Sequence, residues 1–251
     1  MRHRIDVNSD MGESFGVYRY GADEQLMPYI SSANVACGFH GGDPSVMRRT
    51  VQLAKRYGVH VGAHVGFPDK LGFGRRYISV SPEEARDYTV YQMGALDAVL
   101  RLEGMALNHL KFHGALYMMA LTDYTLSAVI LKEVAELYPH LKIYTIANSE
   151  TAKAASHYGL VPVSEYFVDR PYYADTGVKM FGWTVEETGN PRQMAQRVLS
   201  LVTHGEFIGA DGQKISLAAD TVCIHSDTPD ASAIARILRE TLRDAEIAVG
   251  S

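Results

Sequence analysis

The sequence predicts an α/β protein, with a single β/α barrel domain of about seven parallel strands over residues 1–251 as its simplest form. Short apolar runs alternate with helical patterns about seven times. The runs have the composition of strands that are buried on both faces. Polar residues gather directly after the runs. A doubly wound open sheet gives the same alternation and remains the alternative, although the dinucleotide motif G-x-G-x-x-G and a Walker A loop are both missing.

The strand candidates are short and partly β-branched, as buried parallel strands usually are. In chain order they are Ile5–Asn8, Ala33–Cys37, His60–Ala63, Leu107–Phe112, Lys142–Ala147, Val161–Val168 and Thr221–His225.

Helices are expected between these strands because capping residues stand where the helices would begin. A cap residue directly before proline opens four of them, at Asp43-Pro44, Ser81-Pro82, Asn190-Pro191 and Thr228-Pro229. The second also has the capping-box spacing with Glu84 and should run to about Leu102. Residues 207–216 contain two glycines and predict a small hairpin outside the core.

Composition excludes several classes of protein. With 47% hydrophobic and 21% charged residues, the chain is neither disordered nor of low complexity. A net charge of −5 without a basic run argues against nucleic acid as a partner, and no apolar run reaches the ~20 residues of a membrane span. The first residues lack the apolar stretch of a signal peptide, and two cysteines make no disulfide framework. We therefore expect a cytoplasmic protein.

Ionisable and polar residues follow almost every strand candidate. Because the carboxyl ends of parallel strands meet at one rim, residues from distant parts of the chain should converge there. A single histidine at a strand end is more often structural, but four histidines with several carboxylates indicate a functional site. The residues concerned are Asn8, Asp10, Glu13, His40, His64, His113, Asp169, Arg170, His225 and Asp227.

Strand spacing separates some of these residues from their neighbours. His60 and His64 lie four residues apart, which on a strand is about 13 Å, so they share a face but not one ion. The same holds for His109 and His113. Lys111 lies between His109 and His113 and points to the same face of the strand, one step below the rim. It is expected to be buried beside the site, either with a lowered pKa or paired with an acid from the first strand.

The long segment 65–80 is glycine-rich and carries two adjacent arginines, Arg75 and Arg76. A long loop in a compact domain is often a lid, and paired arginines suit a carboxylate or a phosphate. A solvated surface pair is the alternative.

The expected chemistry is general acid–base catalysis. Neither cysteine has an activating partner in sequence, and the G-x-S-x-G motif of serine hydrolases is missing. Histidines and carboxylates carry proton transfer with or without a metal ion. Whether a divalent ion is bound stays open; its ligands would come from Asp10, His40, His64 and His113.

Several motifs together resemble the LamB/YcsF family. They run in order along nearly the whole chain: DVNSDMGESFG at 6–16, SANVACGFHGGDP at 32–44, VGAH at 61–64, GFGRR at 72–76, HGALY at 113–117, DR at 169–170, and ADTVCIH at 219–225 followed by DT at 227–228.

The resemblance implies a seven-stranded barrel related to glycoside hydrolases and deacetylases. It also implies one subunit of an ATP-dependent 5-oxoprolinase, which opens the lactam of 5-oxo-L-proline to L-glutamate with two partner subunits of the B and C type. On this reading the catalytic groups would be Asp10, Glu13, His40, His64 and His113. The groups that bind substrate would be Asn8, Arg75, Arg76, Lys111, Asp169, Arg170, His225 and Asp227.

Two other functions remain open: a stand-alone metal-dependent amidase or deacetylase, and a non-catalytic ligand-binding subunit. The chain also departs from the family pattern at Ser9, Phe112, Ser226 and the segment 179–184, which contains the only tryptophan, Trp183. That tryptophan either walls a pocket or packs its loop down.

Overall fold

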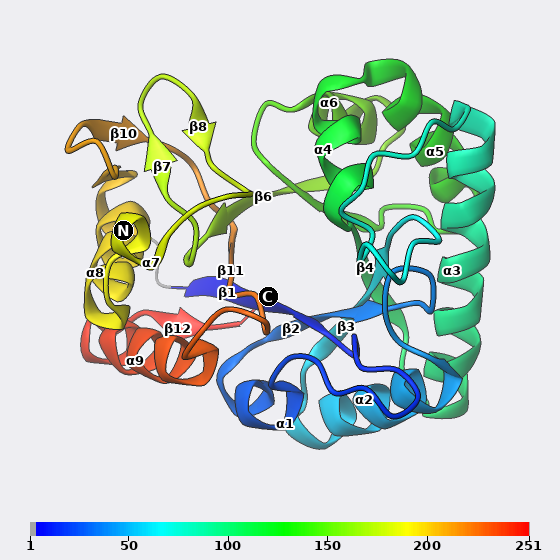
Figure 1. Ribbon diagram of the computed structural model, residues 1–251, viewed down its shortest axis with the longest axis horizontal. Helices are drawn as coiled ribbons and strands as arrows, with labels where there is room; N and C mark the ends of the chain where they lie inside the picture. The colour runs from blue at the N-terminus through cyan, green and yellow to red at the C-terminus, as the bar shows by residue number, and fades with distance from the viewer. Residues whose placement is uncertain (1–3, 251) are drawn as a thin grey trace.

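Seven parallel strands close into a barrel in the computed structural model, which describes residues 4–250 (Figure 1). Residues 1–3 of the opening segment, where no signal peptide is expected, and Ser251 lie outside the described residues. The barrel strands are β1 (Arg4–Met11), β2 (Ser32–Ala36), β3 (His60–Val65), β4 (Leu107–Phe112), β5 (Lys142–Thr145), β6 (Val161–Phe167) and β11 (Thr221–Cys223).

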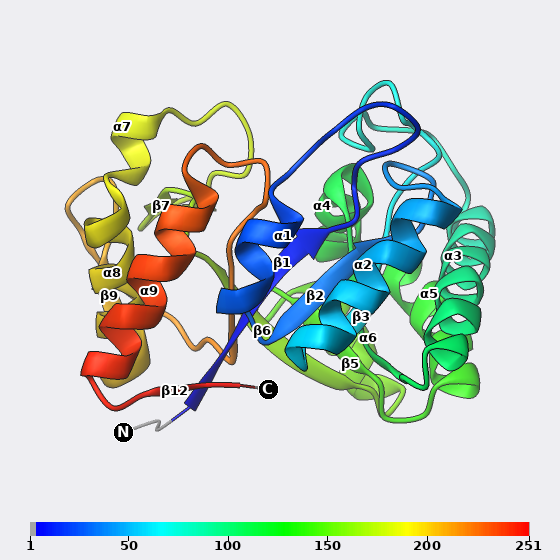
Figure 2. The ribbon, with the colours of Figure 1, turned by 90° about the horizontal axis from the view of Figure 1, so that it is seen from below.

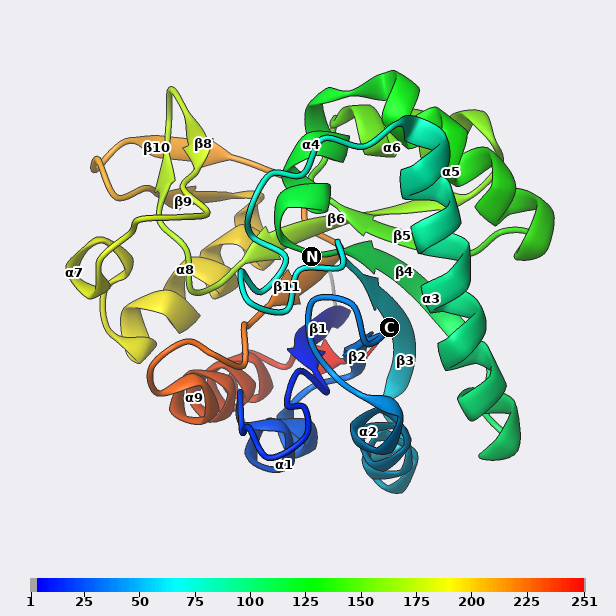
Figure 3. The ribbon, with the colours of Figure 1, turned by 45° about the vertical axis from the view of Figure 1, so that its right-hand side comes forward.

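Closure is made by β11, which pairs with β6 on one side and with β1 on the other. A short strand, β12 (Ala248–Val249), is added beside the start of β1. The predicted barrel is therefore confirmed, and the open sheet is wrong. Figure 3 shows the strands curving around one centre, with α2, α3 and α5 outside them.

All seven predicted strands are present, but the first was placed too short. Asp10, expected in the loop after a strand that ends at Asn8, lies within β1 and is buried. Polar residues are rare in strands, so the pattern suggested an early end. Here they are tolerated because they are hydrogen-bonded: the Asn8 amide donates to the Thr221 hydroxyl at 2.7 Å, and Asn34 donates to Asp10 at 2.7 Å.

The helices surround the barrel. They are α1 (Asp23–Leu26), the 3₁₀ turn η1 (Met27–Tyr29), α2 (Pro44–Tyr57), α3 (Pro82–Leu102), α4 (Gly114–Thr122), α5 (Tyr124–Leu137), α6 (Glu150–His157), α7 (Val185–Thr188), α8 (Pro191–His204) and α9 (Ala231–Asp244). Within residues 4–250 no one helix has the length and apolar character to cross a membrane; α4 and α5, bent by 109°, pass that test only as a pair.

Three of the four predicted helix starts are confirmed, and one is wrong. Asp43, Ser81 and Asn190 cap α2, α3 and α8 as expected. Thr228-Pro229 does not open a helix, because the Thr228 hydroxyl is bonded to Asp169 instead. The last long helix begins after Asp230, which has a left-handed backbone (φ 59°) and makes no side-chain cap.

The chain between β6 and β11 is a long insertion on one side of the barrel. It contains the hairpin of β7 (Tyr172–Tyr173) and β8 (Gly177–Val178), then α7 and α8, then the hairpin of β9 (Glu206–Ile208) and β10 (Lys214–Ser216). The second hairpin was predicted and is confirmed. Figure 2 shows α8 and α9 packed side by side.

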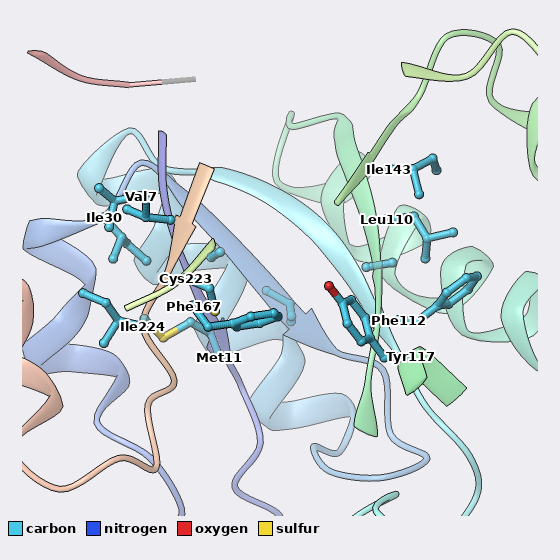
Figure 4. Close-up of a cluster of buried hydrophobic side chains, with 14 of the residues drawn as sticks. Val7, Met11, Ile30, Leu110, Phe112, Tyr117, Ile143, Phe167, Cys223 and Ile224 are labelled. Atoms are coloured by element: carbon cyan, nitrogen blue, oxygen red, sulfur yellow. The ribbon is translucent and has the colours of Figure 1, made fainter. Parts of the chain in front are cut away.

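The apolar core includes side chains from several barrel strands. Figure 4 shows part of it, including Met11 from β1, Leu110 from β4 and Phe167 from β6. The ring of Phe167 meets Tyr117 edge to face with 6.0 Å between centroids. These two rings also line the pocket described next, so the core and the pocket share a wall.

Candidate active site

A small pocket opens at the carboxyl ends of the strands, where the sequence placed the functional rim. Its cavity is about 160 Å³, smaller than the roughly 300–1,000 Å³ of a site for drug-sized ligands, and so suits a small metabolite. Its lining combines ionisable residues with aromatic ones: Asp10, His64, Arg75, Lys111, Phe112, His113, Gly114, Tyr117, Phe167, Arg170, Met180, Phe181, Gly182, Trp183, His225, Asp227 and Thr228.

The floor of the pocket is an ion-paired lysine. Lys111 Nζ lies 3.0 Å from Asp10 Oδ1 and 2.9 Å from Glu165 Oε1, and all three side chains are buried. Burial alone would lower the pKa of Lys111, but Asp10, Cys223 and Glu165 raise it well above its usual value. Burial would likewise raise the pKa of Asp10, yet His64 and Lys111 hold it well below its usual range. Both groups are charged, and the expected pairing of Lys111 with an acid from the first strand is confirmed.

Three histidines stand together beside this pair. His113 Nδ1 lies 3.0 Å from His64 Nε2, and His64 Nε2 lies 3.4 Å from Asp10 Oδ2. His40 stacks on His113 with 3.7 Å between centroids and bonds to Glu13 at 3.3 Å. Burial lowers the pKa of His40 and of His113, so both rings are neutral at neutral pH.

The other two histidines of these strands lie outside the site, as their spacing predicted. His60 is exposed at the opposite end of β3. His109 is buried below the rim, where it bonds to Asn34 at 2.7 Å and stacks on Tyr144.

A carboxylate–histidine pair stands on the other side of the pocket. His225 Nδ1 donates to Asp169 Oδ1 at 2.9 Å, and the Thr228 hydroxyl donates to Asp169 Oδ2 at 2.5 Å. Burial would raise the pKa of Asp169, but His225 and Arg170 lower it, so the carboxylate is ionised. The ionised Asp169 holds the proton of His225 on Nδ1. The other ring nitrogen, His225 Nε2, lies 3.8 Å from Asp10 Oδ2.

Two of the three candidate arginines contribute to the pocket. Arg170 is buried, bonds through Nη1 to Thr228 at 3.2 Å and lies 4.7 Å from the centre of the Trp183 ring. Its Nε has no hydrogen-bond partner among the described residues. Arg75 pairs with Asp227 at 2.7 Å, and the Tyr20 hydroxyl donates to the same carboxylate. Arg76 lies outside the pocket, where it pairs with Asp69 and is largely exposed.

The remaining predicted residues lie behind the pocket lining. Glu13 and His40 lie behind His113, Asp169 behind His225, and Asn8 beneath Lys111, which it meets at 3.5 Å. Burial and the neighbouring Asp10 raise the pKa of Glu13 well above its usual value. Both cysteines are buried, and burial raises the pKa of Cys37 to about 12 and that of Cys223 as well, which disfavours the nucleophilic thiolate in each.

Some pocket residues were missed from sequence. Glu165 was read as part of an apolar strand, although one acid in such a run was a usable signal. Tyr117 and Phe167 looked like core residues, and they are both core and lining. The wall formed by Met180, Phe181 and Trp183 comes from the insertion, and only the lone tryptophan pointed to it.

Two groups of side chains have the donors that a metal ion needs. One is Glu13, His40, His64 and His113, and the other is Asp10, Cys223 and His225; in each, the ligand atoms lie within 4.8 Å of one another. A metal lies near the plane of each imidazole that binds it. The rings of His40 and His113 are parallel within 7°, so no point lies in both planes and they do not bind one ion together. His64 and His113 meet at 90° and are compatible with a shared ion.

Known proteins are similar to this chain along its whole length. The 5-oxoprolinase A subunit from Pyrococcus abyssi is 44% identical over 98% of this chain and 96% of its own, and that from Bacillus subtilis is 46% identical over the same shares. The crystal structure of a lactam utilization protein from Thermus thermophilus superposes with a TM-score of 0.91 at 40% identity, covering 98% of this chain and 99% of that one.

A more distant barrel shares the fold alone. It is a family 4 carbohydrate esterase from Streptomyces lividans, with a TM-score of 0.52 at 12% identity, covering 99% of this chain and 92% of that one. The LamB/YcsF family model matches residues 5–251. The chain belongs to the LamB/YcsF family.

Proposed function

We propose that this chain is the A-type subunit of an ATP-dependent 5-oxoprolinase, and that its pocket is where the lactam of 5-oxo-L-proline is opened to L-glutamate. ATP would be a co-substrate of the complex, which would include two partner subunits of the B and C type. The names of the relatives at 44–46% identity support this assignment. Two buried free cysteines agree with a reducing cytoplasm, where we place the complex.

The proposal rests on one observation: Arg170 and the Asp169–His225 pair contact each other at one small pocket. A 5-oxoproline molecule offers one carboxylate and one cyclic amide. The guanidinium of Arg170 is buried, with its Nε free of partners among the described residues, and is suited to the carboxylate. We assign His225 Nε2, the ring nitrogen that does not bond to Asp169, as the group that takes a proton from water.

The reaction needs activation because a lactam is resonance-stabilised and its unaided opening is slow. Transfer of a phosphoryl group from ATP to the amide oxygen makes the ring carbon electrophilic. Water then attacks that carbon, a new C–O bond forms, and His225 takes the proton. The ring nitrogen accepts a proton as the C–N bond breaks, which leaves an acyl phosphate. A second water releases phosphate, so that 5-oxoproline, ATP and two waters give glutamate, ADP and phosphate.

The ion pairs of the pocket leave one cationic group with a free donor. Lys111 is paired with Asp10 and Glu165, and Arg75 is paired with Asp227. Arg170 meets Asp169 at 3.3 Å through Nη1, while its Nε has no hydrogen-bond partner among the described residues and can donate to an anion. Trp183 stacks over Arg170 and closes that side of the pocket, which strengthens an ion pair by excluding water.

The test is reconstitution. The purified chain is combined with its two partner subunits, 5-oxo-L-proline and ATP, and glutamate is measured with and without the chain. Glutamate that requires both the chain and ATP supports the proposal. Amide hydrolysis by the chain alone, indifferent to ATP, would replace it with the amidase function, and binding of 5-oxo-L-proline with no turnover would replace it with a ligand-binding role.

A further inference from the structure

The hydrogen bonds of His64 and His113 leave two lone pairs facing each other. His64 Nδ1 lies 3.2 Å from the carbonyl oxygen of Lys111, and His113 Nε2 lies 2.7 Å from that of Phe73. A carbonyl oxygen only accepts, so each of these nitrogens carries the proton of its ring. The remaining nitrogens, His64 Nε2 and His113 Nδ1, face each other 3.0 Å apart. Two facing nitrogen lone pairs come this close only with a cation between them, either a proton or a metal ion.

We propose that a divalent transition-metal ion, zinc by preference, binds between His64 Nε2 and His113 Nδ1, with Asp10 and Glu13 as the neighbouring carboxylates. Asp10 Oδ2 is 3.4 Å from His64 Nε2, and Glu13 Oε1 is 3.8 Å from His113 Nδ1. Donor atoms around one zinc ion at bond lengths of about 2.0–2.1 Å are about 3.3 Å apart. Two imidazoles with carboxylates are the donor set of zinc and its neighbours in the first transition row.

The outer contacts of both rings agree with this assignment. A histidine that binds a metal usually donates its other N–H to a backbone carbonyl or a carboxylate, which fixes the tautomer. His64 and His113 both do so, from different strands and to different partners. His40 lies behind the group and bonds to Glu13, so it holds that carboxylate without binding the ion itself.

The site opens into the pocket, since Asp10, His64 and His113 all line it. When bound, such an ion polarises a carbonyl oxygen or lowers the pKa of a bound water. In that respect the inference deepens the proposed function and rests on it. The binding of the ion does not depend on the substrate, so the two proposals can fail separately.

The experiment measures metal content and not turnover. The untagged chain is stripped with a chelator, incubated with zinc, passed through a desalting column and analysed by mass spectrometry. We expect about one ion per chain in the wild type and in His60→Asn, which changes an exposed histidine at the far end of the same strand. His64→Asn and His113→Asn should retain less than about a tenth of that amount.

Cobalt(II) provides a second readout that needs no variant. Bound in place of zinc, it should give visible d–d absorption bands, which zinc then displaces. The proposal is overturned if zinc, cobalt, manganese, iron and nickel all fail to bind in stoichiometric amount, or if both histidine variants, folded by circular dichroism, bind as the wild type does. It is equally overturned if nitrogen-15 spectra of the metal-incubated chain show one proton shared between the two rings.

Discussion

Arg170 is the side chain through which the pocket would recognise a carboxylate. If it binds the substrate as proposed, Arg170→Gln removes one charge-assisted interaction worth about 1.5–3 kcal/mol, or roughly 10- to 150-fold in KM for 5-oxo-L-proline. The kcat should change less. Steady-state kinetics of the reconstituted complex measure both values. Arg101→Gln, which changes an exposed arginine on α3, is the control and should leave both unchanged. An unchanged KM in folded Arg170→Gln would remove Arg170 from the substrate site.

Asp169 accepts the Nδ1 proton of His225, so if His225 is the base, as proposed, the replacement of Asp169 should act on kcat. An asparagine at this position can donate its amide to His225 Nδ1 and so place the ring proton on Nε2, where it blocks the base. We expect kcat to fall by about 10²- to 10⁴-fold in Asp169→Asn, with KM little changed. The outcome that contradicts this role is wild-type kcat in a folded variant.

The ionised Asp169 side chain also stabilises the folded protein at pH values above the pKa that the residue has in the unfolded chain. Its pKa is lowered in the folded protein, so its contribution is present above about pH 4 and is lost as the pH falls through the folded value. Urea unfolding of the wild type should therefore show a falling free energy of unfolding between about pH 5 and pH 2. For Asp169→Asn, the free energy of unfolding should be about 3 kcal/mol lower at pH 7 and should fall less steeply as the pH decreases. Equal slopes would show that Asp169 is not responsible.

At the scale of elements, the loop between β3 and α3 forms a roof over the histidines. Gly74 in this loop has φ 63°, and a Cβ there would lie 2.7 Å from His40 Cβ and 2.9 Å from His113 Cδ2. Its carbonyl also accepts from the amide of Ala115 at the start of α4. The backbone approaches the rings this closely only because residue 74 has no side chain.

Gly74→Ala should therefore reduce stability and kcat by more than backbone strain alone would. Gly58, which ends α2 at φ 67° with open space around it, is the matched control. Gly58→Ala should cost about 1–2 kcal/mol and leave kcat unchanged. Gly74→Ala should cost about 1–3 kcal/mol more and reduce kcat by roughly 10²-fold, because the rings must shift. Thermal unfolding and kinetics of the two variants, measured side by side, decide the matter; equal effects would show that the roof does not position the histidines.

Sequence patterns predicted the elements well where a local signal existed. The caps at Asp43, Ser81 and Asn190 act within one turn of helix, so they could be read directly. Thr228-Pro229 carries the same signal but failed, because a distant carboxylate, Asp169, uses the Thr228 hydroxyl. The end of β1 failed for a similar reason, since its polar residues are satisfied by partners far along the chain.

In the molecule as a whole, the parallel topology explains why the location of the site could be predicted from the sequence. Strand ends that are far apart in sequence meet at one rim, so Asp10, His64, His113 and His225 could be grouped from the amino-acid sequence alone. Their pairings could not, because register and closure decide which side chains touch. Arg75 and Arg76 illustrate this: adjacent in sequence, one lines the pocket and the other lies outside it.

The insertion between β6 and β11 was predicted only in part. The cap of α8 at Asn190 and the β9–β10 hairpin were predicted, whereas β7, β8 and α7 are short and were not. The contribution of the insertion to the pocket depends on how it folds back over the rim. Trp183 lies against Arg170 in that wall, so of the two roles expected for it, walling the pocket is confirmed.

The proposal that this barrel pocket opens the lactam is tested most directly by glutamate release from 5-oxo-L-proline and ATP. The reconstituted complex contains the wild-type chain in one reaction and His225→Asn in a parallel reaction. We expect glutamate with the wild type, and at most about a hundredth of that rate with a folded His225→Asn chain. Equal rates with both chains, or glutamate from the partners without this chain, would contradict the proposal.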